Sequence, residues 1–101
     1  MASSKEYLDF VLDQLSGLDG LATRKMMGEY LLYLDGKLVG GIYDDRLLLK
    51  PTPGALRAGL PADIPYEGAK PMLVPDVDDR EALAALVRII AAEVPAAKKK
   101  K

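Results

Sequence analysis

The chain of 101 residues contains no cysteine and no histidine. Without cysteine it has no disulfide framework and no thiol nucleophile, and without both residue types it lacks the usual ligands of zinc sites. Acid–base chemistry by an imidazole is excluded too, and no histidine is present to activate a serine hydroxyl. We therefore expect a protein that is not an enzyme and that has no metal site and no cofactor.

Long apolar runs are absent as well. No run approaches the roughly 18 residues that a membrane-spanning helix needs. The first five residues, Met1 to Lys5, are not followed by the apolar core of a signal peptide. We expect a cytoplasmic protein that does not associate with a membrane.

Positive charge is scarce outside the C-terminus. Of 14 basic and 15 acidic residues, four basic ones form the run Lys98 to Lys101, which leaves 10 positive against 15 negative charges, or −5, for the rest. An acidic body is a poor electrostatic match for nucleic acid. The length favours one domain, which we place at residues 1–95, and residues 96–101 are expected to be a disordered basic tail.

Apolar residues near the N-terminus recur with the spacing of an amphipathic helix, which we predict over residues 4–18. Ser3, with Glu6 three residues later, has the spacing of a capping box, and Gly17 and Gly20 mark the end. A second such helix follows Asp78, which has Glu81 in the capping-box position. Its predicted buried stripe consists of Leu83, Leu86, Val87, Ile90 and Val94.

A short helix is predicted between these two, with Thr52 as its N-cap and Pro53 at its first position. Two turns stand out earlier in the chain. Asp35-Gly36, between apolar runs, is a strong hairpin signal, and Asp44-Asp45 is predicted to form a second turn.

The apolar runs around these turns predict strands, and the Gly40-Gly41 pair within one of them suggests a bulge or the close approach of another segment. Three consecutive leucines, 47–49, indicate that one side of their strand is buried by a helix and that the other side is not fully solvated. The last strand contains prolines, which cannot donate to a ladder, so we place it at a sheet edge. The predicted strands are residues 23–27, 30–34, 37–43, 46–50 and 70–75.

These elements predict an α+β fold of two layers. Strands joined by hairpins form an antiparallel sheet, here of four to five strands, and the helices cover one of its faces.

Several segments together resemble the N-terminal domain of the TfoX/Sxy family of bacterial competence regulators. The resemblance extends over about residues 5–94, although Met27 replaces a usual phenylalanine and Glu29 a usual glycine. Its motifs are Arg24-Lys25-Met26-Met27-Gly28, Leu34-Asp35-Gly36-Lys37, the residues Asp44, Asp45, Arg46, Leu47, Leu49 and Lys50, then Pro65-Tyr66, and finally Met72, Val74 and Pro75.

The resemblance implies a fold similar to that of type III secretion chaperones, with the order α-β-β-β-α-β-β-α. It also implies a stand-alone form of the family's N-terminal domain, without the second, helical domain. The implied function is that of a regulatory, protein-binding module that acts through an exposed sheet face or an edge strand. An exposed edge could also pair with itself in a homodimer.

The segment around Gly28 is the candidate partner-binding site, because a glycine there would let a partner's backbone approach closely. The alternative is a strand whose methionines fill the core while its basic residues face water. Tyr30 and Tyr33 have opposite parity, so they should point to opposite faces of the sheet, one of them into the core. The candidate residues are Arg24, Lys25, Met26, Met27, Gly28 and Tyr30.

Direct nucleic-acid binding is the alternative function, through Arg24, Lys25, Lys37 and the lysine tail. The adjacent carboxylates Asp44-Asp45 and Asp78-Asp79 are interpreted as a turn and a helix cap. We do not interpret them as metal ligands, because no third group is seen to converge with them.

Overall fold

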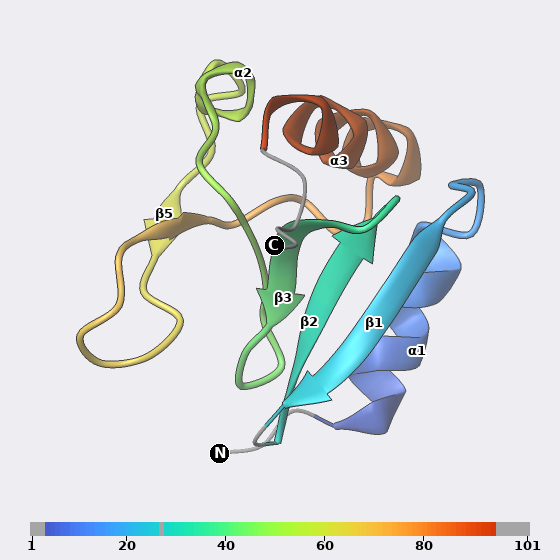
Figure 1. Ribbon diagram of the computed structural model, residues 1–101. Helices are drawn as coiled ribbons and strands as arrows, with labels where there is room; N and C mark the ends of the chain where they lie inside the picture. Colours follow the sequence, from blue (N-terminus) through green and yellow to red (C-terminus); the bar gives the residue numbers. More distant parts are fainter. Residues whose placement is uncertain (1–3, 27, 95–101) are drawn as a thin grey trace, which may run out of the picture.

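The structure is a computed structural model that describes residues 4–26 and 28–94. The described residues form three helices and an open antiparallel sheet of six strands (Figure 1), which confirms the predicted α+β class. The sheet has six strands, more than the four to five predicted. Four strands precede the second helix, whereas the order implied by the resemblance has three. In chain order the elements are α1 (Lys5–Gln14), β1 (Leu21–Met26), β2 (Glu29–Leu34), β3 (Lys37–Ile42), β4 (Leu47–Leu49), α2 (Pro53–Leu56), β5 (Ala62–Asp63), β6 (Met72–Leu73) and α3 (Arg80–Glu93).

Two tight turns build the first half of the sheet. Asp35 and Gly36, with φ of 53° and 80°, join β2 to β3, and Asp44 and Asp45, with φ of 54° and 57°, join β3 to β4. Positive φ at both central residues matches the right-handed twist of the paired strands. Both predicted turns are confirmed.

The strand order is β1-β2-β3-β4-β6-β5, so β1 and β5 are the two edges. The prediction that the last strand lies at an edge is wrong, because β6 lies between β4 and β5. Pro71 and Pro75 flank Met72–Leu73 and do not interrupt its pairing. The strand β5 was not predicted, because it has only two residues and stands beside a segment rich in turn-forming residues.

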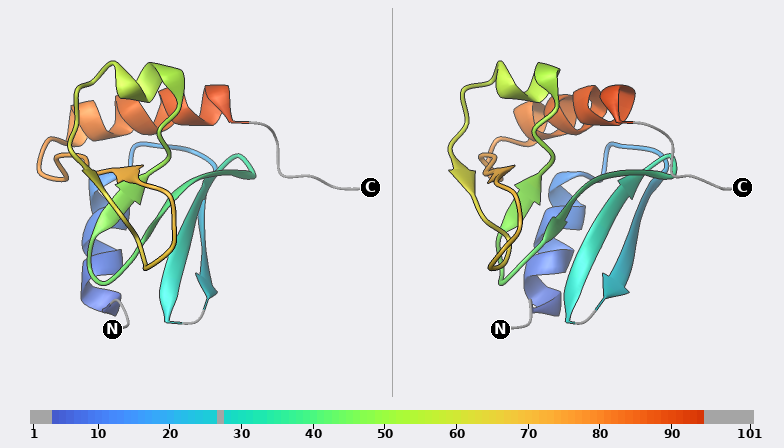
Figure 2. Two further views of the ribbon diagram at one scale, coloured as in Figure 1. Left: turned by 90° about the vertical axis from the view of Figure 1, so that its left-hand side faces the viewer. Right: turned by 60° about the vertical axis from the view of Figure 1, so that its left-hand side comes forward.

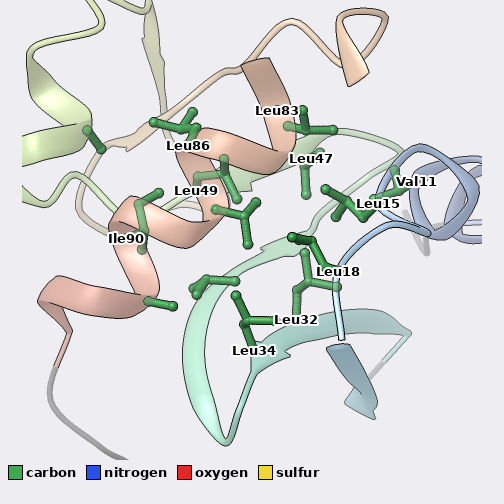
Figure 3. Packing of buried hydrophobic residues seen from close by; sticks show 14 of the residues in the cluster. Val11, Leu15, Leu18, Leu32, Leu34, Leu47, Leu49, Leu83, Leu86 and Ile90 are labelled. Carbon is green, nitrogen blue, oxygen red and sulfur yellow. The ribbon is translucent and has the colours of Figure 1, made fainter. Parts of the chain in front are cut away.

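One hydrophobic core lies between the sheet and the two longer helices (Figure 2). Val11 of α1 and Leu15, directly after that helix, point into it, as do Leu32 and Leu34 of β2 (Figure 3). The predicted stripe of α3 is confirmed, since all its members are buried: Leu83, Leu86, Val87, Ile90 and Val94.

The helix ends differ from prediction by a few residues. Helix α1 ends at Gln14 although Leu15 and Leu18 are both buried, because the chain turns there while its apolar residues keep contact with the core. Its N-cap is Ser4, whose Oγ accepts a hydrogen bond from the Tyr7 amide at 3.2 Å. The predicted cap, Ser3, lies outside the described residues.

Helix α3 is capped by Asp79, one residue after the predicted Asp78. The Asp79 carboxylate accepts a hydrogen bond from the Ala82 amide at 3.1 Å. The short helix α2 begins as predicted, with Thr52 as N-cap and Pro53 at its first position.

The leucine strand β4 is buried on one side by the helices, as predicted, and its other side is buried as well, which goes further than the prediction. Leu47 and Leu49 belong to the core between sheet and helices, whereas Leu48 points to the other face and is also fully buried. A segment outside the two longer helices therefore covers part of that second face of the sheet.

Candidate functional site

The sheet has a second side, which we call the open face. Residues that pair directly across neighbouring strands share a face, and faces alternate along a strand. Since Leu32 and Leu34 belong to the core, Leu31 and Tyr33 lie on the open face with their partners in β1 and β3. The open face carries Ala22, Arg24, Met26, Glu29, Leu31, Tyr33, Leu38, Gly41, Tyr43 and Leu48.

The two tyrosines of β2 divide between the faces as predicted. Tyr30 packs against the core cluster, and Tyr33 lies on the open face, opposite Ala22 on one side and Leu38 on the other. Of these two tyrosines, it is therefore Tyr33 that could contact a partner at the open face.

The predicted binding residues do not form one patch. Arg24 and Met26 lie on the open face and are exposed, Met26 to 48%. Lys25 is paired with Tyr30 and lies on the side of the helices. Gly28 is in the turn that follows, with a φ of 85°.

Met27, the remaining predicted residue, lies outside the described residues. The alternation along β1 thus separates the two basic side chains that are adjacent in sequence, and it places one of them on each side of the sheet.

Gly41 makes room for an aromatic ring on the open face. A Cβ at this position would lie 2.7 Å from the Tyr30 carbonyl oxygen and 2.9 Å from the ring and the hydroxyl of Tyr43. The close approach predicted for the Gly40-Gly41 pair is confirmed, and a bulge accompanies it, since the β2–β3 register shifts between Leu32 and Tyr33. The missing side chain lets Tyr43 lie across β3.

Arg46 fixes a distant segment over the open face. Its Nε donates to the Tyr43 carbonyl at 3.2 Å, and its guanidinium donates to the Pro65 carbonyl at 3.4 Å. The same guanidinium forms an ion pair with Asp63. Pro65 is buried, and the segment it belongs to lies on the side of the sheet where Leu48 is fully buried.

The contacts of Asp63 favour its charged form. The backbone N–H of Ile64 donates to this carboxylate at 2.8 Å and, together with the Arg46 hydrogen bond, lowers the pKa of Asp63 below its ordinary value. The carboxylate is therefore ionised at neutral pH and available to hold Arg46.

Tyr66 extends the aromatic surface. It is 64% exposed, and its ring centroid lies 6.2 Å from that of Tyr43 with an interplanar angle of 57°. Burial, and secondarily the proximity of Tyr66 and Glu29, raise the pKa of Tyr43 above its usual value. Its hydroxyl is therefore protonated at neutral pH and can donate a hydrogen bond.

Sequence reasoning did not find the Arg46–Asp63 pair, because the partners lie 17 positions apart in chain segments of different type. The signal was present in the family motifs, since the Asp44-Asp45-Arg46 turn and Pro65-Tyr66 are the segments that meet here.

Asp45 has a structural role as well. Its Oδ1 accepts from the Ser4 amide at 2.7 Å and so ties the start of α1 to this turn.

The open face presents tyrosine, leucine and arginine side chains. Within residues 4–26 and 28–94, no group of three or more acidic side chains is arranged to hold a metal ion. Among the same residues, no helix is long and apolar enough to cross a membrane. Tyrosine and arginine are the residue types that often carry binding energy in protein interfaces, and the leucines beside them add apolar contact area.

Comparisons with known proteins give one family. The family model of the TfoX N-terminal domain matches residues 13–89. A protein of Spirochaeta aurantia, named an uncharacterized 12.7 kDa protein in the trpE 5′ region, is 39% identical over 105 aligned positions, which cover 100% of this chain and 91% of that protein. No solved structure matches. The chain belongs to the TfoX N-terminal domain family.

Proposed function

We propose that this chain is a non-enzymatic regulatory module of the cytoplasm that binds another protein through the open face of its sheet. Family membership supports the regulatory role. The observation that carries the proposal is the row of side chains on the side of β1 to β3 away from the longer helices. Arg24, Met26, Leu31, Tyr33 and Tyr43 lie there together.

These side chains suit a protein partner because they combine apolar area with polar ends. Tyr33 and Leu31 are half-buried against their neighbours. A partner would therefore gain contact area, and these two side chains would lose little rotamer freedom on binding. Arg24 is exposed and makes no ion pair with any residue in the described ranges. We infer that the partner presents apolar side chains and a carboxylate that meets Arg24.

A protein partner is favoured over nucleic acid by the geometry of β1. A backbone-tracking groove needs several cations on one side together with stacking aromatics. Here Arg24 and Lys25 lie on opposite sides of the sheet, and the open face also carries Glu29. The lysine tail lies outside the described residues.

The test uses the two basic residues as matched variants. Arg24→Glu and Lys25→Glu make the same type of charge change at adjacent, exposed positions of one strand, so they differ mainly in the face they alter. Each tagged variant is used to capture proteins from the native host, and the captured proteins are quantified by mass spectrometry.

We expect Arg24→Glu to lose at least about tenfold of a specific partner that the parent captures, and Lys25→Glu to retain it. Tyr33→Ala should lose the same partner, since truncation of a tyrosine at an interface hot spot costs about 2 kcal/mol or more. Equal loss in both charge variants, or equal retention, would refute binding through the open face. Unchanged thermal unfolding of each variant is the control for folding.

A further inference from the structure

The edge strand β1 leaves one row of backbone groups without a strand partner among the described residues. It stands first in the sheet order and pairs only with β2, and its residues from Ala22 to Met26 are all exposed. Figure 1 shows β1 as the outermost strand on its side of the sheet, with α1 behind it. The opposite edge, β5, has only two residues. The long free edge is therefore a ready template for another strand.

The hairpin register tells which groups are free. Met26 and Glu29 pair directly and are separated by only two positions in the chain, so they form a hydrogen-bonded pair. Bonding alternates along an antiparallel pair, so the N–H and C=O groups of Leu21, Thr23 and Lys25 point away from β2. The bond from the Asp35 amide to the Gly20 carbonyl, at 3.0 Å, fits the same alternation at the start of the strand.

We propose that a second copy of the chain adds its β1 to this edge in antiparallel orientation. The two-fold axis would be perpendicular to the sheet and pass beside Thr23, so that Thr23 faces Thr23 of the second copy. Leu21 would face Lys25 in both directions. Each of these pairs would exchange two backbone hydrogen bonds.

This register is singled out by both hydrogen bonding and charge. With Thr23 on the axis, all the outward-pointing residues of β1 form backbone hydrogen bonds with the other copy. If Ala22 or Arg24 lay on the axis instead, one outward-pointing residue of each copy would have no hydrogen-bonded partner in the other strand. The shift to Arg24 also sets two arginines directly opposite, which is destabilising. With Thr23 on the axis, Arg24 faces the small Ala22 instead.

The side chains of β1 are complementary to themselves in this arrangement. The β-branched Thr23 pair suits a strand, and the aliphatic stem of Lys25 would cover the half-buried Leu21 while its charge stays in water. The axis keeps both open faces on one side. The two Arg24 side chains would lie diagonally across the axis on that face, whereas Met26 would lie farther out, opposite Gly20 of the other copy. The proposal does not depend on the partner proposed above.

A contact made mainly by one strand is small, below about 1,000 Å², so we expect a weak dimer in equilibrium with monomer. Sedimentation of the full chain from about 10 µM to about 1 mM should show the equilibrium. Thr23→Pro removes an outward N–H and leaves the β1–β2 ladder intact, since proline is tolerated on the free side of an edge strand. It should weaken the dimer at least tenfold, whereas Thr23→Val, which keeps the N–H, should not.

Cysteine cross-linking tests the register itself, because the chain has no cysteine of its own. Residues of a hydrogen-bonded pair have Cα atoms about 5.5 Å apart, a distance that a disulfide spans. Oxidation should cross-link Thr23→Cys rapidly. Ala22→Cys and Arg24→Cys should react slowly alone and rapidly when mixed, because these positions face each other across the axis.

Three results would each overturn the proposal. They are a monomer at every concentration, a Thr23→Pro protein that folds and dimerises as tightly as the parent, and cross-linking that is equally fast at all three cysteine positions. Tyr33 lies in β2, away from the edge. Tyr33→Ala should therefore leave the dimer unchanged while it abolishes capture of the protein partner, so the two proposals fail independently.

Discussion

Single residues decide the shape of the open face. Tyr43 lies across β3 because Gly41 has no Cβ, and Arg46 then holds the Tyr66 segment beside the tyrosine ring. These contacts fix the rings of Tyr43 and Tyr66 next to each other on the open face.

Gly41→Ala should destabilise the protein by about 1–3 kcal/mol, since the new methyl group would meet a backbone oxygen that cannot move freely. Gly17→Ala is the matched control, because a Cβ there meets nothing within 4 Å and no positive φ opposes it. It should change stability by no more than about 0.5 kcal/mol. Urea unfolding of both variants measures the difference, and equal stability of the two would contradict the packing described for Tyr43.

The sequence predicted local features of this face well and distant ones poorly. The Asp35-Gly36 turn and the opposite orientation of Tyr30 and Tyr33 follow from the nearest neighbours in the chain, so pattern alone was sufficient. The Arg46–Asp63 pair depends on how a loop folds back over β4, and no local spacing contains that information. The division of Arg24 from Lys25 was also available from alternation, but the two were grouped by their charge.

At the scale of elements, helix ends depend on a single capping residue. Asp79→Ala should remove the N-cap of α3 and cost about 1 kcal/mol, in the range of 0.5–2. Asp78→Ala, one residue earlier and equally exposed, should cost clearly less. Thermal unfolding of the two variants distinguishes them. A larger loss of stability for Asp78→Ala than for Asp79→Ala would show that Asp78 is the N-cap, as the sequence predicted.

The packing of α2 on α3 should depend on pH through Glu93. Its carboxylate accepts hydrogen bonds from the Thr52 hydroxyl and from the Gly54 amide, the latter at 2.8 Å, and these lower the pKa of Glu93 from the ordinary 4.5. The folded state therefore favours the ionised form. Its stabilising contribution is present above the unfolded-state pKa and is lost as pH falls through the lower folded-state pKa.

Glu93→Gln should accordingly lose less stability than the parent between about pH 6 and pH 3. Denaturant unfolding across this range provides the measurement. A Glu93→Gln profile as steep as the parent's would show that the carboxylate does not link the two helices in the way described.

The short elements explain why the architecture could be predicted only in outline. The helices and hairpins of the first half carry their own signals in periodicity and turn chemistry. Strands β5 and β6 have two residues each and form only because they pair with each other and with Leu49 of β4. Strand β6 falls within the predicted strand 70–75, whereas β5 has no signal of its own, so neither the sixth strand nor the true edge was visible in the sequence.

At the scale of the whole molecule, the two sides of the sheet differ. The side with the helices holds the core. We propose that the open face contacts a partner protein and that β1, at its border, pairs with a second copy. The C-terminal end of the family match, at residue 89, falls within α3, so the matched region includes every strand of the sheet.

The most direct test of the central claim places a photo-crosslinking phenylalanine analogue at position 33 and, in a separate variant, at position 10. Tyr33 lies on the open face, whereas Phe10 is an exposed aromatic residue on α1, 37% accessible. Irradiation in the native host should yield one specific protein adduct from position 33 and none from position 10. The same adduct from position 10 alone, or no adduct from position 33, would contradict partner binding by the open face.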